Sequence, residues 1–377
     1  MKTNRSTSAI VIVSLFVFGQ ILSAQFNVRS TISSMADDNV NNNAFQVKSN
    51  VTSFNLNGGY SWDNESNFTS LYYDGTFTYY ESFLQRTNHF HSINAEFVQL
   101  YGNEDQNVLT TGGQLGTSIN RDDYVIFDHT QFAAFINYKF FAADWLINKF
   151  GYSLRTISFA SLDDFSYTEH AIFAHAAVAA TQMTTLIVQT DLGTKFYSST
   201  PSGSSSSMRK GVMSSLLPSV TQLTGMLKLG QRITDELGVS VTERYQWNIQ
   251  KQSRYLSSDY GFISDDELFD DHYGYEGFHT NAVITALLSE SVTLKLSGGL
   301  QDKLYSSLSA YDWDGNVVAA QRVDTRSYMN IGLQKNFDEI GFSLKGAVDV
   351  IQNSSNDSFY SYKNNAFTLE ISIPFSN

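Results

Sequence analysis

Alternation with a period of two, sustained over long segments, constrains this chain more than any other feature of its sequence. Between residues 186 and 196, Leu186, Val188, Leu192 and Phe196 share one parity, while polar or small residues hold most positions between them. Successive side chains of a β-strand point to opposite faces of its sheet, so this segment would have one apolar and one polar face. A tilted strand needs about 9–11 residues to cross a bilayer. The pattern therefore predicts amphipathic strands of membrane-spanning length.

The connections between the alternating segments also follow a rhythm. Tight turns at 180–184, 234–236, 289–291 and 338–339 alternate with long polar loops at 198–219, 252–276, 306–321 and 352–363. Phe337 and Phe342 flank one tight turn, and Phe375 lies at the same end of the last segment, as in an aromatic girdle. In hydrocarbon every backbone group must be paired, so a sheet there has to close on itself. A soluble β-sandwich is the alternative, but it would show shorter strands and more frequent turn signals.

The N-terminus and the composition indicate an exported protein. Lys2 and Arg5 precede an apolar run over 9–22, and Leu22-Ser23-Ala24 has the small residues of a cleavage site. We therefore expect residues 1–24 to be a secretory signal peptide and 25–377 to form a single domain. The chain has only 16% charged residues, 14% aromatic residues and no cysteine, which excludes disulfides, thiolate catalysis and a lipoprotein anchor. A net charge of −13 without a basic block argues against nucleic acid as a partner.

Together these features resemble those of Gram-negative outer-membrane β-barrel proteins, over the whole mature chain. The resemblance includes a final amphipathic strand that ends near an aromatic residue, Phe375, although Ser376 and Asn377 follow it. It implies location in the bacterial outer membrane, contact with outer-membrane lipid and lipopolysaccharide, and recognition of the C-terminal strand by the barrel-assembly machinery. No particular family within the class is identified from the sequence.

The number of strands follows from a count of the alternating segments. Ten are predicted at approximately 148–160, 167–180, 184–197, 220–233, 237–251, 277–289, 291–305, 322–337, 339–352 and 363–375. Segments 71–79 and 132–140 also alternate, whereas 107–119 is rich in Gly and Thr and gives a weak signal. Between Val47 and Tyr60 the apolar phase slips, which suggests a bulge or a missed turn. Bacterial single-chain barrels have even strand numbers, so we predict an all-β, closed antiparallel barrel of about 16 strands, with 14 as the alternative.

The polar face of the strands would line the lumen. The residues predicted to line a pore are Lys195, Lys228, Arg232, Arg244, Lys295, Lys303, Arg322, Arg326, Lys345, Asp191, Asp349 and Glu370. A mixed but mainly basic wall predicts a passive, porin-like channel for small polar solutes with a preference for anions. The alternatives are a barrel plugged by salt-bridged struts, or a non-conducting barrel whose external loops bind a partner or a surface glycan. Glu243 does not fit, because it lies on the apolar face; a subunit contact, a bulge or a different register could each explain it.

Two features raise the question of metal binding and catalysis. Hard cations take oxygen ligands, which the acidic loop residues Asp265, Asp266, Glu267, Asp270 and Asp271 could supply. Their spacing matches no EF-hand, so we interpret them as a solvated loop and predict no cofactor. Barrel lipid hydrolases place a histidine and a serine two residues apart, and no histidine here has that neighbour. We therefore predict that the chain is not an enzyme, with a lipid-modifying enzyme as the least favoured alternative.

Overall fold

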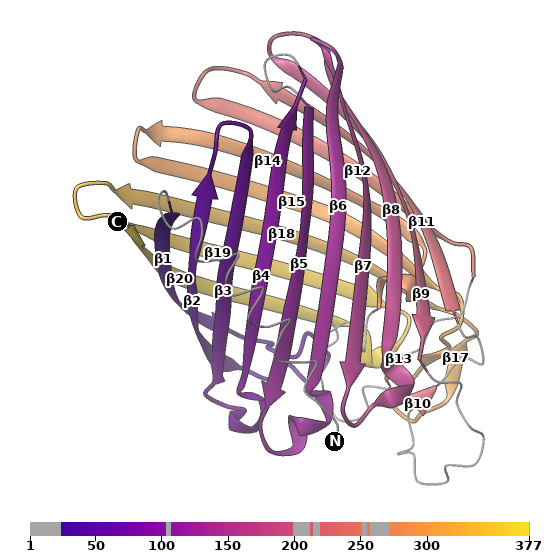
Figure 1. The fold of residues 1–377 in the computed structure, drawn as a ribbon. Helices are drawn as coiled ribbons and strands as arrows, with labels where there is room; N and C mark the ends of the chain where they lie inside the picture. The colour runs from indigo at the N-terminus through magenta and orange to yellow at the C-terminus, as the bar shows by residue number, and fades with distance from the viewer. Residues whose placement is uncertain are drawn as a thin grey trace, which may run out of the picture.

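The computed structural model describes residues 24–102, 107–198, 212–213, 219–250, 255–256 and 271–376. Within these residues, sixteen long antiparallel strands form one closed sheet in which β1 pairs with β20 (Figure 1). The strands of the barrel are β1 (Ala24–Asp37), β2 (Ser49–Asp63), β3 (Asn67–Tyr80), β4 (Asn88–Tyr101), β5 (Asn107–Asn120), β6 (His129–Ala143), β7 (Leu146–Phe159), β8 (Tyr167–Ala179), β9 (Thr184–Tyr197), β11 (Ser219–Arg232), β12 (Leu237–Asn248), β14 (Gly277–Ser289), β15 (Val292–Tyr305), β18 (Arg322–Phe337), β19 (Phe342–Ser355) and β20 (Tyr362–Ser376).

The predicted closed barrel of 16 strands is confirmed, and the 14-stranded barrel and the β-sandwich are excluded. All ten predicted C-terminal segments form strands whose ends differ by only a few residues from the expected ones. The weak Gly- and Thr-rich segment forms β5, which pairs along its length with β4 and β6. Pairing supplied by both neighbours therefore compensates for its poor strand propensity.

The expectation of a bulge or a missed turn between Val47 and Tyr60 is wrong. Strand β2 pairs with β1 and β3 without any register shift. The apolar phase slips because Val51 is buried on the inner face, whereas Phe54 and Leu56 are exposed on the outer face. Val51 lies close to the end of β2 where connecting segments fold into the barrel, so an apolar side chain on the inner face is buried there.

The two ends of the barrel differ in their connections (Figure 1). At the upper end in the figure, which we call the turn end, neighbouring strands are joined by short segments such as 144–145, 290–291 and 338–341. At the lower end, the loop end, the connections include two small sheets, β10 (Val212–Met213) with β13 (Tyr255–Leu256) and β16 (Ala310–Tyr311) with β17 (Val317–Ala319). They also include the 3-10 helices η2 (Leu84–Arg86), η4 (Asp122–Phe127), η5 (Asp163–Phe165), η6 (His272–Gly274) and η7 (Ser358–Tyr360).

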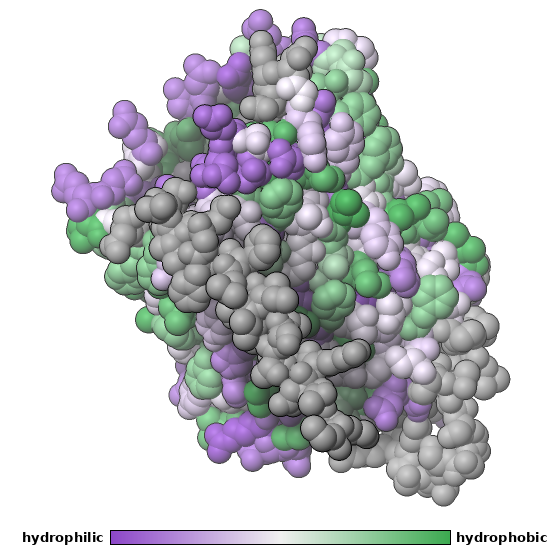
Figure 2. Space-filling view, viewed as in Figure 1, coloured by the Kyte–Doolittle hydropathy of each residue, from purple (hydrophilic) through white to green (hydrophobic). Residues whose placement is uncertain are grey.

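The outer face of the barrel is apolar, with aromatic rings at the turn end. Phe337 and Phe342 stack there with their ring centroids 4.5 Å apart, as the girdle prediction requires, and Phe375 is 55% exposed. Apolar and weakly polar side chains cover much of the visible wall, and the most hydrophilic ones gather mainly at the two ends (Figure 2). Among the described residues, no helix is long and apolar enough to cross a membrane.

Glu243 lies on this outer face in an unbroken register. Its strand, β12, pairs with β11 and β14 without a shift, which excludes both a bulge and a different register. The hydroxyl of Thr280, directly opposite on β14, donates a hydrogen bond to the Glu243 carboxylate. This contact lowers the cost of an outward-facing acid.

Buried side chains gather inside the barrel near its loop end. Ile157, Phe159, Phe165 and Tyr167 form an apolar cluster there, between β7, η5 and β8. In the segment that joins β1 to β2, Asn39 and Asn43 are both completely buried, and the side-chain amide of Asn39 donates to the carbonyl oxygens of Asn43 and Lys363. The core of this protein therefore combines inner-face side chains near the loop ends of strands with connections folded back into the lumen.

Candidate functional site

The register of the strands defines an inner face that runs continuously around the barrel. Residues directly opposite each other in an antiparallel pair lie on the same face. Lys195 on β9 is opposite Glu169 on β8 and Val220 on β11, and the same relation continues from strand to strand. By this criterion all twelve predicted pore-lining residues lie on the face opposite the exposed apolar side chains. That they line an open solute pathway stays a prediction.

Three of the predicted basic residues are buried at the loop end. They are Lys195, Lys303 and Arg322, which are 1%, 6% and 4% exposed. The Lys195 Nζ lies 2.9 Å from an Asp271 carboxylate oxygen and 4.1 Å from the centre of the Tyr167 ring. The Lys303 Nζ lies 4.7 Å from the centre of the Tyr275 ring. Burial of a charge is costly unless it is paired, so these contacts are part of the structure of the barrel.

Arg322 lies between a carboxylate and two aromatic rings. Its Nε donates to Asp324 at 3.0 Å, and a second guanidinium nitrogen makes a close contact with the other oxygen of that carboxylate. The guanidinium carbon lies 4.4 Å from the centre of the Tyr305 ring and 3.2 Å from that of Tyr360. The hydroxyl of Ser355 also donates to Asp324. This cluster joins β15, β18 and β19 to η7.

A short segment that precedes β14 is folded into the barrel, and we call residues 271–276 the strap. Its backbone carbonyls accept hydrogen bonds from amide side chains of the wall: Gln222 and Gln246 donate to His272, Gln246 also donates to Tyr275, and Asn248 donates to Tyr273. The amides thus provide the partners that an irregular segment needs inside a barrel. The strap is fixed along the inner wall of β11 and β12.

The strap also contacts the wall through Tyr273. Its hydroxyl donates to the Glu169 carboxylate at 2.6 Å. A Cβ atom at Gly193 would collide with that same hydroxyl. Glycine at this position of β9 therefore leaves the space in which the Tyr273 side chain lies.

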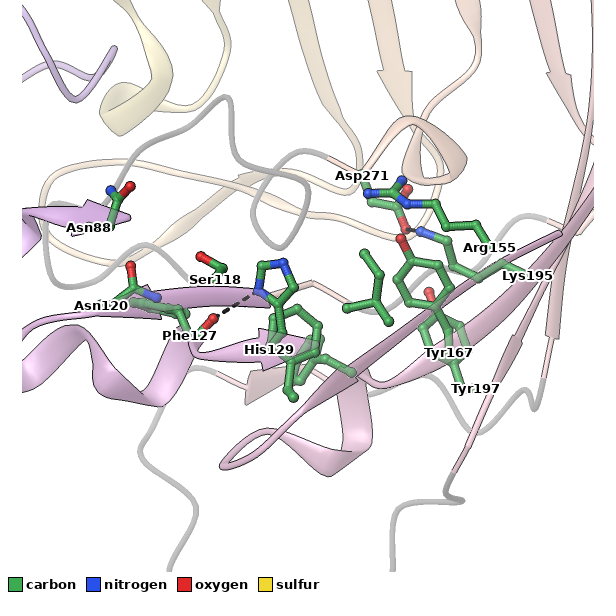
Figure 3. A pocket seen from close by; sticks show the side chains of 13 residues that line it. Asn88, Ser118, Asn120, Phe127, His129, Arg155, Tyr167, Lys195, Tyr197 and Asp271 are labelled. Carbon is green, nitrogen blue, oxygen red and sulfur yellow. Dashed lines mark hydrogen bonds and ion pairs between the residues drawn. The ribbon is translucent and has the colours of Figure 1, made fainter. Parts of the chain in front are cut away.

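A cavity of about 230 Å³ adjoins the Lys195–Asp271 pair (Figure 3). One part of its wall is apolar and is formed by Phe127, Ile157, Phe159 and Phe165. The rest is polar and includes the side chains of Asn88, Ser118, Asn120, His129 and Arg155. In Figure 3, Arg155 lies beside Asp271, and His129 is hydrogen-bonded through Nδ1 to the Phe127 carbonyl at 3.0 Å.

A second cavity, of about 250 Å³, is bordered by the strap residues His272, Tyr273 and Tyr275. Its lining includes Asp191 and Arg244, two of the predicted pore-lining residues. The Arg244 side chain is exposed on the inner face. The strap therefore borders two spaces of similar size, and each is lined in part by polar side chains.

Four predicted basic residues differ from the buried ones, because they have no ion-pair or hydrogen-bond partner in the described part of the chain. They are Lys228, Arg244, Lys295 and Lys345. Two acidic residues of the same face are hydrogen-bonded by neutral amides: Asn330 donates to Asp349 at 2.6 Å, and Gln189 donates to Asp191 at 2.8 Å. Four positive side chains on the inner face are therefore not neutralised by direct contact.

The other predicted residues are distributed along the wall. Arg232 lies at the turn end, 3.6 Å from Asp235, Arg326 is opposite Gln301, and Glu370 is opposite Lys345. Of the candidate metal ligands, Asp265, Asp266, Glu267 and Asp270 lie outside the described residues, and Asp271 is the ion-pair partner of Lys195. In the described part of the chain, no group of three or more His, Asp or Glu side chains could hold a metal ion.

Sequence reasoning missed the residues that hold the strap. Alternation places Glu169, Gly193 and Gln222 on the inner face, but it contains no sign that residues 271–276 return to contact them. The signal available was the run of Tyr and Gly in 272–277 directly after the acidic loop. Asp271 belongs with this segment and differs in role from a solvated loop acid.

No family model and no curated protein matches this chain. Among solved structures, two of OccK3 (OpdO) of Pseudomonas aeruginosa are similar to this chain. The similarity covers 96% of this chain and 98% and 99% of those chains, with TM-scores of 0.52 and 0.53 and 8% identity. OccK8 (OprE) of the same organism is similar over 95% of this chain and 99% of that one, with a TM-score of 0.51 and 11% identity. The fold of this chain is that of the OccK3 and OccK8 structures. At such low identity the likeness extends to the fold alone.

Proposed function

We propose that this protein is a porin-like outer-membrane channel for small polar solutes, with its turns in the periplasm and its loops outside the cell. The observation that carries the proposal is the set of four unneutralised basic side chains, Lys228, Arg244, Lys295 and Lys345, on the inner face of a closed barrel. Charged side chains on a pore wall set ion selectivity. We infer a preference for anionic solutes.

The strap supports this function as a narrowing of the pathway. It is held to the wall by amide-to-carbonyl hydrogen bonds and by the Lys195–Asp271 pair, whose Lys195 and Asp271 side chains are 1% and 4% exposed. A segment fixed this firmly gives the lumen a defined width at one level. Solutes would pass beside it through the polar spaces that it borders.

Liposome swelling tests the proposal directly. Proteoliposomes containing the purified barrel should swell at a rate that falls with solute size, and small organic anions should enter faster than cations of equal size. The matched control is the same barrel with Lys228, Arg244, Lys295 and Lys345 replaced by glutamine, which should lose the charge preference and keep the size limit. Absence of swelling above that of protein-free liposomes would contradict the proposal.

One observation favours a second candidate function, a non-conducting barrel whose external loops bind a partner or a surface glycan. Buried segments occupy part of the lumen at the loop end, including the Asn39–Asn43 turn and the Arg322 cluster. If these segments block the pathway, correctly folded protein will not support swelling, and binding by the loops becomes the favoured function. On either function we expect contact with lipopolysaccharide, assembly through the C-terminal strand and no enzymatic activity.

A further inference from the structure

An unusual chain of polar side chains lies on the outer face of β3 and β4. The Tyr73 hydroxyl is 2.6 Å from His91 Nδ1, and His91 Nε2 is 2.8 Å from His89 Nδ1. Gly75 is directly opposite His91, and a Cβ atom there would collide with the Tyr73 hydroxyl. Tyr73 therefore reaches His91 across a position that only glycine leaves open.

The hydrogen-bonded series Tyr73–His91–His89 always has one hydrogen-bond donor without an acceptor. If Tyr73 donates to His91 and His91 donates to His89, the remaining N–H is on His89 Nε2. If the bonds run in the opposite sense, the remaining donor is the Tyr73 O–H. In the described part of the chain neither group has a further partner. A neutral imidazole has one donor and one acceptor. An acceptor from outside the protein is therefore needed to satisfy the remaining donor of the Tyr73–His91–His89 series in either sense.

A groove of about 500 Å³ lies beside this chain on the same outer face. Its rim carries the exposed apolar side chains of Ile93, Leu115 and Phe132, which are 60%, 63% and 41% exposed. Thr117, Thr130 and Thr156 also line it, and these smaller side chains leave a hollow between the large ones. The groove is thus mainly apolar, with the Tyr73–His91 end as its polar part.

The position of this site decides which kind of molecule can occupy it. All of these residues lie on the lipid-facing side, and His89 is the second residue of β4 from the loop end. On the orientation of the proposed function, that end faces the outer leaflet, at the depth of lipid headgroups. An occupant must therefore present a hydrogen-bond acceptor at the rim and an apolar chain below it.

We propose that this outer face binds one lipopolysaccharide molecule through its lipid A part, with a phosphate accepting from His89 and an acyl chain in the groove. Lipid A combines phosphates with several acyl chains, and in Gram-negative bacteria it forms the outer leaflet. A phosphate at the rim favours the sense in which Tyr73 donates to His91 and His91 donates to His89. The inference rests on the membrane placement of the proposed function, and it is independent of whether the lumen conducts.

Native mass spectrometry of the purified full barrel tests this binding, with lipid A, dephosphorylated lipid A and phosphatidylglycerol as the probes. The binding variant is H89L/H91L. The matched control is H170L, because His170 is also an outward imidazole bonded to a tyrosine, Tyr152, but does not line the groove. We expect H89L/H91L to bind lipid A at least about tenfold more weakly, which corresponds to about 1.4 kcal/mol. We expect H170L to bind it like the wild type.

A groove-filling variant keeps the test decisive if the histidine variant does not fold. T130F should weaken binding of both lipid A and its dephosphorylated form, because it occupies the space for the acyl chain. Equal binding of lipid A by the wild type and H89L/H91L would overturn the proposal. Binding of phosphatidylglycerol as tightly as lipid A would also overturn it. An oligomer that dissociates in T130F would overturn it too, because a second copy of the protein would then occupy the groove. Conductance should be the same in the wild type and in all variants. A wild-type barrel that does not conduct would contradict the channel function and leave this proposal standing.

Discussion

Lys195 and Lys228 are basic residues of the same inner face, in neighbouring strands of the barrel, and their surroundings differ completely. Lys195 is buried and paired with Asp271, whereas Lys228 has no ion-pair or hydrogen-bond partner among the described residues. Alternation in the sequence predicts the face on which each side chain lies. It does not predict the ion-pair partner of either side chain, because a partner can come from a segment that is remote in sequence, as Asp271 is from Lys195.

We expect the D271N substitution to destabilise the barrel. Removing one partner of a buried ion pair leaves the other charge unpaired at a cost of about 3–5 kcal/mol. Urea unfolding of the reconstituted protein measures the change. The control is K195M/D271L, which removes both charges and should recover most of the lost stability. If the single and double variants unfold at the same urea concentration, the ion pair does not hold the strap.

K228Q should have the opposite profile. Because Lys228 makes no described ion pair or hydrogen bond, its loss should change the free energy of unfolding by no more than about 0.5 kcal/mol. It should nevertheless reduce the preference for anions, measured as the permeability ratio of chloride to potassium. A large loss of stability with unchanged selectivity would show that Lys228 is a structural residue.

At the scale of elements, the strap is the part of the molecule that the sequence does not predict. Long strands are encoded locally, by alternation and by the turns at their ends, and even the weak segment 107–119 forms β5 because its two neighbours pair with it. The strap is held by residues on four strands, β8, β9, β11 and β12, each of which contributes only one or a few contacts. Gly193, Gln222, Gln246 and Asn248 lie on the inner face, but their contacts with residues 271–276 form only in the folded barrel and cannot be predicted from their own strands.

G193V tests the role of this element without removing any of its hydrogen-bonding groups. The valine side chain would occupy the space of the Tyr273 hydroxyl and so break its bond to Glu169. We expect larger and noisier single-channel currents, because the strap is no longer fixed at that point. The matched control is G230V on the inner face of β11, where a Cβ atom would meet nothing closer than 3.8 Å. Identical currents from G193V and the wild type would contradict a role of the strap as a narrowing.

At the scale of the whole molecule, the order of strands and the rhythm of short turns and long loops could be predicted from the sequence. Hydrocarbon on the outside requires apolar outer faces and a closed hydrogen-bond network, so these properties appear in every strand. The contents of the lumen could not be predicted, since buried residues such as Asn39 and Phe165 lie in connections without periodicity. The pattern that specifies the barrel therefore recurs in every strand, whereas the width of the pathway depends on a few inward-folded segments.

The reversal potential of the wild-type barrel under a potassium chloride gradient, in planar bilayers, tests the central claim most directly. The account predicts a conducting channel that is more permeable to chloride than to potassium. It also predicts that this preference is lost when Lys228, Arg244, Lys295 and Lys345 are replaced together by glutamine. A folded barrel that carries no current, or one that is more permeable to potassium, would contradict it.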